Sequence, residues 1–493
     1  MVLNSHAATR NVDMHMPSND RSNIDGIQTA NGTSQPSNSL EQEDYDLIVA
    51  GFGPAALSIA IAIEDALEET NGQALHGLSR KPRILFLEKQ EHFAWHPGML
   101  LEGTRMQISF IKDLATLRNP RSRFTFLNYL HTKKRIIQFS NLDTFLPARL
   151  EFQDYLKWCA QYFEDDVRYG QEVLKVFPDS YGSDGAIERF RIAARSTKMA
   201  EETTFRARHV VIAIGGQPSI PKLFQINNNA RIIHSSRYAQ EVSRQLQDTN
   251  GSYKIAVVGG GQSAAEVFDN LHSRYPKSKT HLLLRGSTLR PSDDSPFVNE
   301  IFDPERIRPF YEADPEIRHA TNGSHQNTNY GVVRLQLLEK VYETLYMQRL
   351  AYDREEEWPH RIMPNASIVQ VRQGEADRVR LEFNWKSPGE LSKCVLEAVE
   401  YDLVVLATGY GHNGHEDILK NLESLEARSG QPWTVGKDYR LVLNNQSISR
   451  DAGIWLQGCN EATHGLSDTL LSGLAVRGGE LVHSIFDNPL PAE

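Results

Sequence analysis

One pattern occurs twice in this sequence: an apolar run, a cluster of glycines and then a helix-forming stretch. The first copy is VAGFGPAALSIAIAI at residues 49–63, and the second is KIAVVGGGQSAAEVFDNL at residues 254–271. A short apolar run before glycines is typical of a buried parallel strand. Glycines at this junction let a pyrophosphate approach the backbone and the start of the helix. Two such units predict an α/β chain with two Rossmann-like dinucleotide-binding domains.

The residues that end the following strands distinguish the two units. RILFLEK (83–89) predicts a strand ending at Glu88, and THLLLRG (280–286) predicts one ending at Arg285. An acid here accepts hydrogen bonds from a free ribose 2′-hydroxyl, whereas an arginine pairs with a 2′-phosphate. The first site therefore suits FAD and the second NADPH, the alternative being a degenerate second site. Glu88 is farther from its glycines than the usual ~20 residues, and we expect a helix extension and loop over 69–82 to account for this.

Two further apolar runs that end in glycines predict how the units are connected. They are HVVIAIGGQPSIP (209–221) and YDLVVLATGYGHNGH (401–415), and each is typical of a buried strand. We therefore expect an FAD-binding domain over 45–215 and 401–485, with an NADPH-binding domain inserted over 216–400.

Two polar segments are expected to lie outside the regular elements. Residues 1–44 are rich in Ser and Asn and lack the apolar run of a signal peptide, so they predict a disordered polar tail. Residues 311–330 are polar and contain turn formers, which favours a surface loop or lid.

Composition excludes several classes of function. A net charge of −10 argues against a nucleic-acid partner or an anionic membrane surface. The 3 cysteines form no CxxC, which argues against a zinc ribbon and a disulfide reductase and fits a reducing compartment, the cytoplasm. No apolar run reaches the ~18 residues of a membrane helix. We predict no metal site.

Several segments resemble the flavin-dependent N-hydroxylating monooxygenases, and most nearly the fungal ornithine-hydroxylating members. These segments are the first glycine loop, the 259–264 glycines, FAWHPGMLLEGTRMQISFIKDLATLRNPRSRFTFLNYL (93–130), SDDSPFVNEIF (292–302), the ATGY stretch from Asp402 to His415, and HGLSDTLLSGLAVR (464–477). The resemblance covers about residues 45–485.

The resemblance also implies which residues bind each molecule. It implies FAD on Gly51, Gly53, Pro54, Glu88, Lys89, His96, Gln107, Thr469, Leu470 and Leu471, with backbone contacts from Val173 to the adenine. It implies NADPH on Gly260, Gly261, Gln262, Ser263 and Arg285, and an amino-acid substrate on Lys112, Asn299, Asn329 and Ser472.

The activity that the resemblance implies is N-hydroxylation of the side-chain amine of L-ornithine for hydroxamate siderophore biosynthesis. It would use NADPH and O2 and proceed through a C4a-hydroperoxyflavin, in a homotetramer. An L-lysine N(6)-hydroxylase is the alternative, because one methylene in a pocket is worth only ~1–3 kcal/mol. A non-catalytic FAD- and NADPH-binding regulator is a further alternative.

The substrate residues are ambiguous without the resemblance. Lys112 lies in the apolar stretch ISFIKDLATL, where an unpaired ammonium is costly and an anion is expected, although a solvated surface charge is the alternative. Asn299 could equally be a turn residue or a helix cap, and Ser472 a hydroxyl on a helix surface. Neutral amides near a reacting amine avoid raising its pKa, as a carboxylate would.

Overall fold

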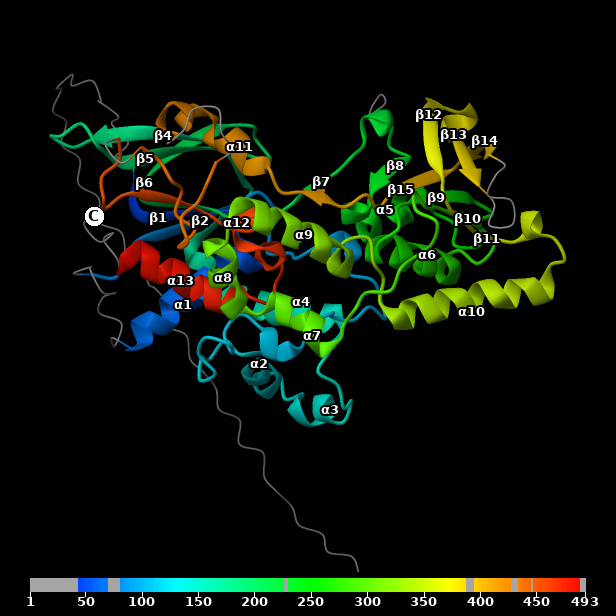
Figure 1. Cartoon of the computed structure of the whole chain (residues 1–493), viewed down its shortest axis with the longest axis horizontal. Helices are drawn as coiled ribbons and strands as arrows, with labels where there is room; N and C mark the ends of the chain where they lie inside the picture. The colour runs from blue at the N-terminus through cyan, green and yellow to red at the C-terminus, as the bar shows by residue number, and fades with distance from the viewer. Residues whose placement is uncertain are drawn as a thin grey trace, which may run out of the picture. The chain divides into compact units, whose positions relative to one another are not determined.

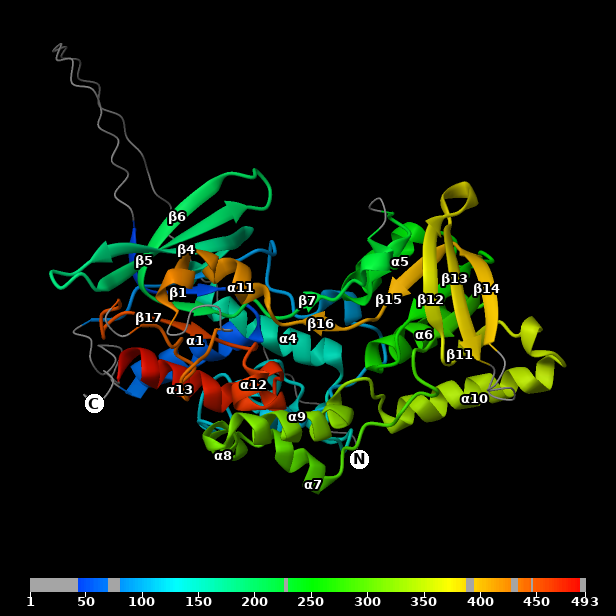
Figure 2. The same cartoon turned by 45° about the horizontal axis from the view of Figure 1, so that its top comes forward.

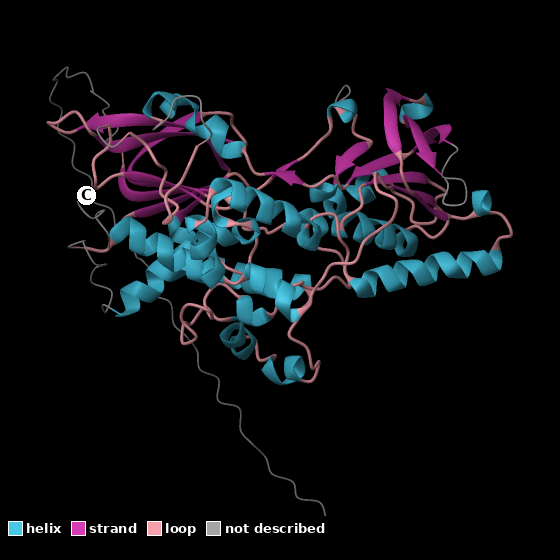
Figure 3. Ribbon diagram, viewed as in Figure 1, coloured by secondary structure: helices cyan, strands magenta, loops and turns pink. Residues whose placement is uncertain are grey.

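The computed structural model describes residues 43–69, 80–225, 229–386, 394–426, 433–444 and 447–487, and these belong to one unit (Figures 1 and 3). The predicted tail over 1–44 lies outside the described residues except for residues 43 and 44. The predicted extension and loop over 69–82 likewise falls mostly outside them, since residues 70–79 are not described.

The first sheet has a parallel centre and an antiparallel extension. Its strand order is β3-β2-β1-β6-β5-β4, and β17 pairs with β6 as well. β1, β2, β3, β6 and β17 run parallel, whereas β4 and β5 continue the sheet in antiparallel pairs. The strands are β1 (Asp44–Ala50), β2 (Ile84–Glu88), β3 (Val167–Tyr169), β4 (Gln171–Tyr181), β5 (Ile187–Ser196), β6 (Glu202–Ile212) and β17 (Gly453–Leu456).

Helices cover one face of this sheet and enclose an apolar core with it. The helices that contribute to this core are α1 (Pro54–Glu69), α2 (Phe126–Thr132), α3 (Ile136–Ser140), α4 (Arg149–Ala160) and α13 (Leu474–Phe486). A second core lies on the opposite face, where β4 and β5 fold over and α11 (Gly414–Leu419) packs. The sheet is therefore buried on both faces, which explains the continuous apolar character of LIVA in β1.

The second sheet is entirely parallel, with the order β11-β10-β9-β15-β8. Its strands are β8 (Ile232–His234), β9 (Lys254–Val258), β10 (Lys279–Leu283), β11 (His360–Met363) and β15 (Leu403–Leu406). One face is covered by α5 (Tyr238–Gln245), α6 (Gln262–Arg274) and α10 (Leu335–Ala351). The other is covered by an antiparallel meander of β12 (Ser367–Gln373), β13 (Val379–Lys386) and β14 (Cys394–Tyr401).

The fold class predicted from the two glycine patterns is confirmed. Each pattern forms a strand, a glycine loop, a helix and a second parallel strand: β1-α1-β2 in the first unit and β9-α6-β10 in the second. Because β10 ends at Leu283, Arg285 lies just beyond the strand rather than at its end.

The prediction that the FAD-binding domain resumes at residue 401 is wrong for the first residues of that segment. β15 pairs with β9 and β8, so residues 403–406 belong to the second sheet. The chain crosses between the sheets later, where β16 (Tyr410–Gly411) pairs antiparallel with β7 (Gln217–Pro218). The two crossings thus form one short ribbon, which Figure 2 labels.

The loop predicted over 311–330 is also wrong, because most of it forms a helix. α9 (Pro315–Asn329) follows α7 (Pro296–Asn299) and α8 (Ile307–Glu312), and both α8 and α9 pack against α12 (Glu461–His464). Arg318 Nη1 donates to the carbonyl oxygens of Tyr311 and Ala313 at 2.8 and 2.7 Å. The side chain of Asn322 donates to the carbonyl oxygen of Glu461 at 2.8 Å. These tertiary contacts outweigh the weak helix propensity of the segment.

No helix in the described part of the chain combines the length and the apolar character that crossing a bilayer requires.

Candidate active site

The first glycine loop joins the end of β1 to the start of α1. Gly51 has a φ of 95°, and a Cβ atom on it would lie 2.6 Å from the carbonyl oxygen of Ala213, so the neighbouring strand requires glycine here. At Gly53, in contrast, a Cβ atom would meet no protein atom within 4 Å. Pro54 then begins α1. The open space beside Gly53, at a helix N-terminus, fits a pyrophosphate against the backbone.

Glu88 holds this loop from the end of β2. Its carboxylate accepts the backbone N–H of Phe52 at 2.7 Å and that of Gln90 at 2.8 Å. Because each carboxylate oxygen has two acceptor sites, Glu88 can still accept ribose hydroxyls. Lys89 is exposed after the strand, and Val173 lies on the edge strand β4 with its side chain against the core of this sheet.

Two buried side chains at the first site have polar atoms without a partner. The side-chain amide of Gln457 and the hydroxyl of Ser472 make no hydrogen bond within the described chain, although these residues are only 3% and 2% exposed. Gln457 follows β17, whose last residue is in register with Ile212, as is Ala50. The Gln457 backbone therefore leaves the sheet at the same edge as the glycine loop. Buried polar atoms without partners are costly, so both side chains fit a polar ligand.

The second glycine loop repeats the geometry of the first. Gly259 has a φ of 146°, and a Cβ atom on it would lie 2.3 Å from the carbonyl oxygen of Ala407. Around Gly260 and Gly261 a Cβ atom would meet only ordinary contacts, at 3.6 and 3.5 Å. Ser263 follows in the first turn of α6. This loop fits a second dinucleotide, and the exposed Arg285 side chain makes no ion pair within the described chain.

A partly buried chain of hydrogen bonds connects the two dinucleotide-binding units. Arg149 of α4 donates to both carboxylate oxygens of Glu266 of α6 at 2.7 Å. Gln262 donates to Glu266 at 2.7 Å and accepts the backbone N–H of Arg334 at 2.9 Å. Arg334 in turn donates to the carbonyl oxygen of Met106 at 2.9 Å. The second glycine loop is thereby fixed against the 105–107 segment of the first unit.

His96 and Gln107 lie on this same side of the first unit. His96 is in the left-handed region, with a φ of 44°, and its ring centroid is 5.6 Å from that of Tyr410. Although His96 is an exposed residue, much protein surrounds its ring. The resulting desolvation is the main cause, and repulsion from Arg149 the next, that lowers the pKa of His96 to about 4. The imidazole is therefore neutral at pH 7. The side chain of Gln107 is exposed next to the buried Met106.

Apart from Ser472, the predicted substrate residues lie on three separate segments. Lys112 ends η2 (Phe110–Lys112), and its ammonium lies 3.9 Å from the carboxylate of Asp303. Its side chain is 27% exposed, so the ammonium is only partly desolvated. Asn299, at the end of α7, is exposed, and its amide donates to the carbonyl oxygen of Asp294 at 3.0 Å. Asn329 ends α9 and makes no side-chain hydrogen bond within the described chain.

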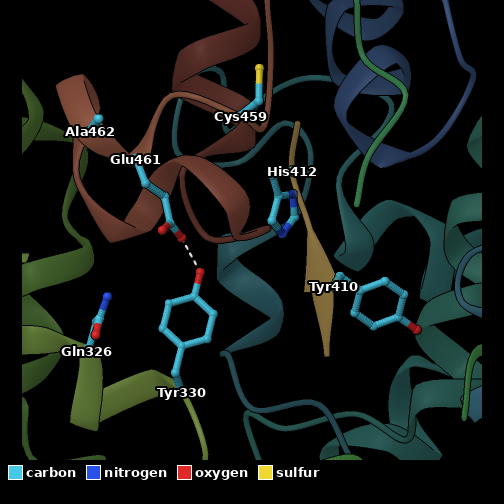
Figure 4. A pocket seen from close by; sticks show the side chains of 7 residues that line it. All are labelled: Gln326, Tyr330, Tyr410, His412, Cys459, Glu461 and Ala462. Atoms are coloured by element: carbon cyan, nitrogen blue, oxygen red, sulfur yellow. Dashed lines mark hydrogen bonds between the residues drawn. The ribbon is translucent and has the colours of Figure 1, made fainter. Parts of the chain in front are cut away.

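The segments of Asn299 and Asn329 meet at η11 (Leu466–Thr469), which packs against both α9 and η6 (Glu300–Phe302), the turn that follows α7. The hydroxyl of Tyr330 donates to the carboxylate of Glu461, and so does that of Thr469, at 2.9 Å. A cavity of about 400 Å³ lies here, and Figure 4 shows Tyr330 and Glu461 meeting across it. The side chains that line it come from the end of α9, the β7–β16 ribbon, the turn after β17 and α12, and they are Gln326, Tyr330, Tyr410, His412, Cys459, Glu461 and Ala462.

A buried ion pair fixes the segment that carries Thr469, Leu470, Leu471 and Ser472. Arg477 of α13 donates to Asp468 at 2.8 Å, and these side chains are 3% and 0% exposed. The other carboxylate oxygen of Asp468 accepts the backbone N–H of Asn460 at 2.6 Å. Asp468 therefore ties α13 to the turn that follows β17.

Some of these residues were not predicted from the sequence. Gln457 could have been predicted, because it is a polar residue directly after an apolar run. In parallel sheets, ligands bind at the carboxyl ends of such strands. Asp303 and Glu461 had no such signal, because each is one acid among many. The pair of Arg149 and Glu266 joins residues far apart in the chain, so only the tertiary structure reveals it.

Comparison with known proteins places these features in a family. Residues 43–412 match the family described as L-lysine 6-monooxygenase/L-ornithine 5-monooxygenase. The L-ornithine N(5)-monooxygenase of the fungus Cochliobolus heterostrophus is 50% identical over 91% of this chain and 88% of its own length.

Two solved structures resemble the fold. The ornithine hydroxylase of Pseudomonas aeruginosa has a TM-score of 0.79 and 36% identity, covering 90% of this chain and 99% of its own. The ornithine N-hydroxylase of Kutzneria sp. 744, with reduced FAD, NADP⁺ and L-ornithine, has a TM-score of 0.78 and 34% identity over the same shares of the two chains.

Proposed function

This chain belongs to the L-lysine 6-monooxygenase/L-ornithine 5-monooxygenase family, and on that premise we propose how its residues divide the work. The chain hydroxylates the side-chain amine of L-ornithine with FAD and NADPH. Bound FAD would accept a hydride from NADPH and transfer one oxygen atom of O2 to the amine. The protein must therefore bind both dinucleotides, hold the amine at the flavin and exclude water. We propose that the product serves hydroxamate siderophore biosynthesis.

The first glycine loop, Glu88 and the 469–471 segment are proposed to hold FAD, with His96, Gln107 and the Val173 backbone beside it. The observation that most supports this is the buried, unpartnered side-chain amide of Gln457 at the carboxyl edge of the first sheet. The second glycine loop and Arg285 are proposed to hold NADPH. The chain of hydrogen bonds from Arg149 to Met106 would then keep the two dinucleotides at a fixed separation.

Lys112 is proposed to bind the substrate carboxylate, with Asn299, Asn329 and Ser472 near the rest of the molecule. The reacting amine has an ordinary pKa of about 10.4, so its neutral form costs about 4.6 kcal/mol at pH 7. Neutral amides near the amine add nothing to that cost, whereas a free carboxylate would. The acid that lines the cavity, Glu461, is already bound to Tyr330 and Thr469.

The test is a comparison of amines. The purified yellow protein, supplied with NADPH and O2, should form a hydroxylamine with ornithine, less with lysine and none without an amine. A longer substrate differs by one methylene, which is worth only ~1–3 kcal/mol. Equal or faster hydroxylation of lysine would favour the lysine hydroxylase instead. If neither amine yields product and no hydrogen peroxide forms, a non-catalytic regulator becomes the better interpretation.

Arg285 should determine the choice of nicotinamide coenzyme. Arg285→Ala is expected to raise the half-saturating NADPH concentration roughly 10- to 150-fold, because a charge-assisted hydrogen bond contributes about 1.5–3 kcal/mol. The value for NADH should stay the same, and so should the FAD content. Arg354→Ala, which removes an arginine that is also exposed and is paired with Glu357, serves as the control. Equal use of NADH and NADPH by the unmutated protein would contradict this assignment.

The homotetramer is proposed to use the outer face of α10. Leu335, Tyr342, Tyr346 and Leu350 are 53%, 74%, 53% and 68% exposed, and their spacing places them on one side of the helix. We propose that a second copy of this chain covers this stripe. Glu339 lies in the first half of α10 and Arg349 in the last turn, so an antiparallel pair of helices would set an acid against a base.

Charge placed on this stripe should dissociate the assembly. The double variant Tyr342→Glu/Leu350→Glu is expected to sediment as a smaller species than the unmutated protein. Met199→Glu is the matched control, since Met199 is 70% exposed but lies on the turn between β5 and β6. An unchanged sedimentation coefficient of the double variant, or a monomeric unmutated protein, would show that α10 is not the interface.

We also propose a cytoplasmic location, supported by the free, exposed thiol of Cys394.

A further inference from the structure

Lys112 faces an acidic residue, Asp303, whose side chain has no other partner within the described chain. The two charged groups approach from different segments, because Asp303 lies between η6 and η7 (Pro304–Arg306). Their closest atoms, Nζ and Oδ1, are 3.9 Å apart, which is beyond hydrogen-bond length. Neither side chain makes a hydrogen bond within the described chain, and they are 27% and 47% exposed.

Asp303 differs in this respect from Glu300 and Asn299 on the same segment. Although it occupies the N-cap position of η7, its carboxylate does not cap that turn. Glu300, three residues earlier, is bound to Arg306 at 2.6 Å. The amide of Asn299 is bound to the backbone of Asp294. Asp303 therefore has its acceptor atoms available, and it is the carboxylate that lies beside the Lys112 ammonium.

We propose that Asp303 binds the α-ammonium group of the substrate while Lys112 binds its α-carboxylate. This inference rests on the proposed role of Lys112. The two groups of an amino acid are bonded to one carbon atom, so a site for both needs opposite charges side by side. Lys112 and Asp303 satisfy that condition and are not held together by a hydrogen bond, so the substrate can exchange their weak mutual attraction for two charge-assisted hydrogen bonds.

A purely structural ion pair explains the observation less well. Partly exposed pairs contribute only ~0–1 kcal/mol even when they are in contact, and this one is not. The pairing of Asp303 with Lys112 also suits the chemistry of the reaction, because it places the carboxylate at the amino-acid end of the substrate. The reacting amine lies at the other end of the side chain, where its pKa is raised less by the Asp303 charge.

The consequence is selection for α-amino acids. A substrate without the α-amino group, such as 5-aminopentanoate, keeps the Lys112 partner and loses the Asp303 partner. A diamine without the carboxylate, such as 1,4-diaminobutane, keeps the Asp303 partner and leaves Lys112 unpaired. Both should bind less tightly than ornithine, and each should report on one residue of the pair.

The experiment measures the dissociation constants of these three ligands for the FAD-loaded, NADP⁺-bound protein by equilibrium dialysis, together with kcat and KM for hydroxylation. In Asp303→Asn, the dissociation constant of ornithine is expected to rise roughly tenfold or more, since a charge-assisted hydrogen bond is lost. The value for 5-aminopentanoate should not change, so the preference for ornithine should disappear. The KM for ornithine should rise more than kcat falls.

Two variants make the outcomes distinguishable. Glu300→Gln, which removes a nearby carboxylate that already has a partner, should bind all three ligands as the unmutated protein does. Lys112→Met should reverse the pattern, weakening ornithine and 5-aminopentanoate but not 1,4-diaminobutane. If Lys112→Met affects all three ligands alike, the proposed role of Lys112 fails. If Asp303→Asn weakens ornithine and 5-aminopentanoate equally, or if the unmutated protein binds both equally, the assignment of Asp303 is overturned.

Discussion

A Gly53→Val variant is expected to fold and to purify without FAD, whereas a Gly51→Val variant is expected not to fold. The space beside Gly53 contains no protein atom within 4 Å of an added Cβ atom, so valine fits the chain and occupies the position of the pyrophosphate. At Gly51 the added atom would lie 2.6 Å from the Ala213 carbonyl oxygen, and the φ of 95° is one that valine avoids.

The measurement is flavin absorbance per mole of protein, combined with circular dichroism of the soluble fraction. Gly261→Ala, in the second unit, is the control: it should keep its FAD and lose affinity for NADPH. A Gly53→Val protein that retains a full complement of FAD would falsify the assignment of this loop to the pyrophosphate. Normal folding of Gly51→Val would show that the β1–β6 junction tolerates a side chain.

Removing the charge of Asp468 should lower the stability of the protein more than any surface substitution. Asp468→Asn leaves the Arg477 guanidinium buried and without its counter-charge, which typically costs about 3–5 kcal/mol in the free energy of unfolding. Because Asp468 also binds the Asn460 backbone, the segment from Thr469 to Ser472 should lose its fixed position. We therefore expect a lower melting temperature and weaker FAD retention.

Two comparisons separate the ion pair from general damage. Glu312→Gln breaks an exposed pair with Arg308 and should leave the melting temperature nearly unchanged, since such pairs contribute ~0–1 kcal/mol. The double variant Asp468→Leu/Arg477→Met removes both charges and should recover part of the stability lost in Asp468→Asn. If Asp468→Asn melts together with the unmutated protein, the pair does not stabilise this region.

Local pattern was sufficient to predict the two dinucleotide-binding units. The apolar runs before Gly51 and Gly259 become buried parallel strands because both faces of each sheet are covered, and this covering is what makes the runs continuous. The physical requirement for glycine differs from one position to another. Gly51 and Gly259 are required by the neighbouring strand, and Gly53 alone leaves the open space that the pattern was thought to require of both glycines in the first loop.

Elements that depend on distant contacts could not be predicted in this way. The sequence of α9 contains Gly323 and several Asn, Ser and Thr residues, which favour loops, and contacts with α12 make it helical. The apolar run at 401–406 was assigned to the wrong sheet, because a buried parallel strand has the same composition in either one. Whether the Asp303 carboxylate is free to bind a ligand depends on which groups the neighbouring side chains bind. No sequence pattern predicts those partners.

The short ribbon of β7 and β16 has a consequence for how such chains can be recombined. Because the strands pair, the two ends of the inserted unit lie side by side, at Gln217–Pro218 and Tyr410–Gly411, a geometry that makes an insertion easy to exchange. The exchangeable segment also contains Asn299, Asp303 and Asn329, however. Under the substrate roles proposed for these residues, a chimera that borrowed this module from a relative to change its coenzyme would inherit the relative's amine specificity as well.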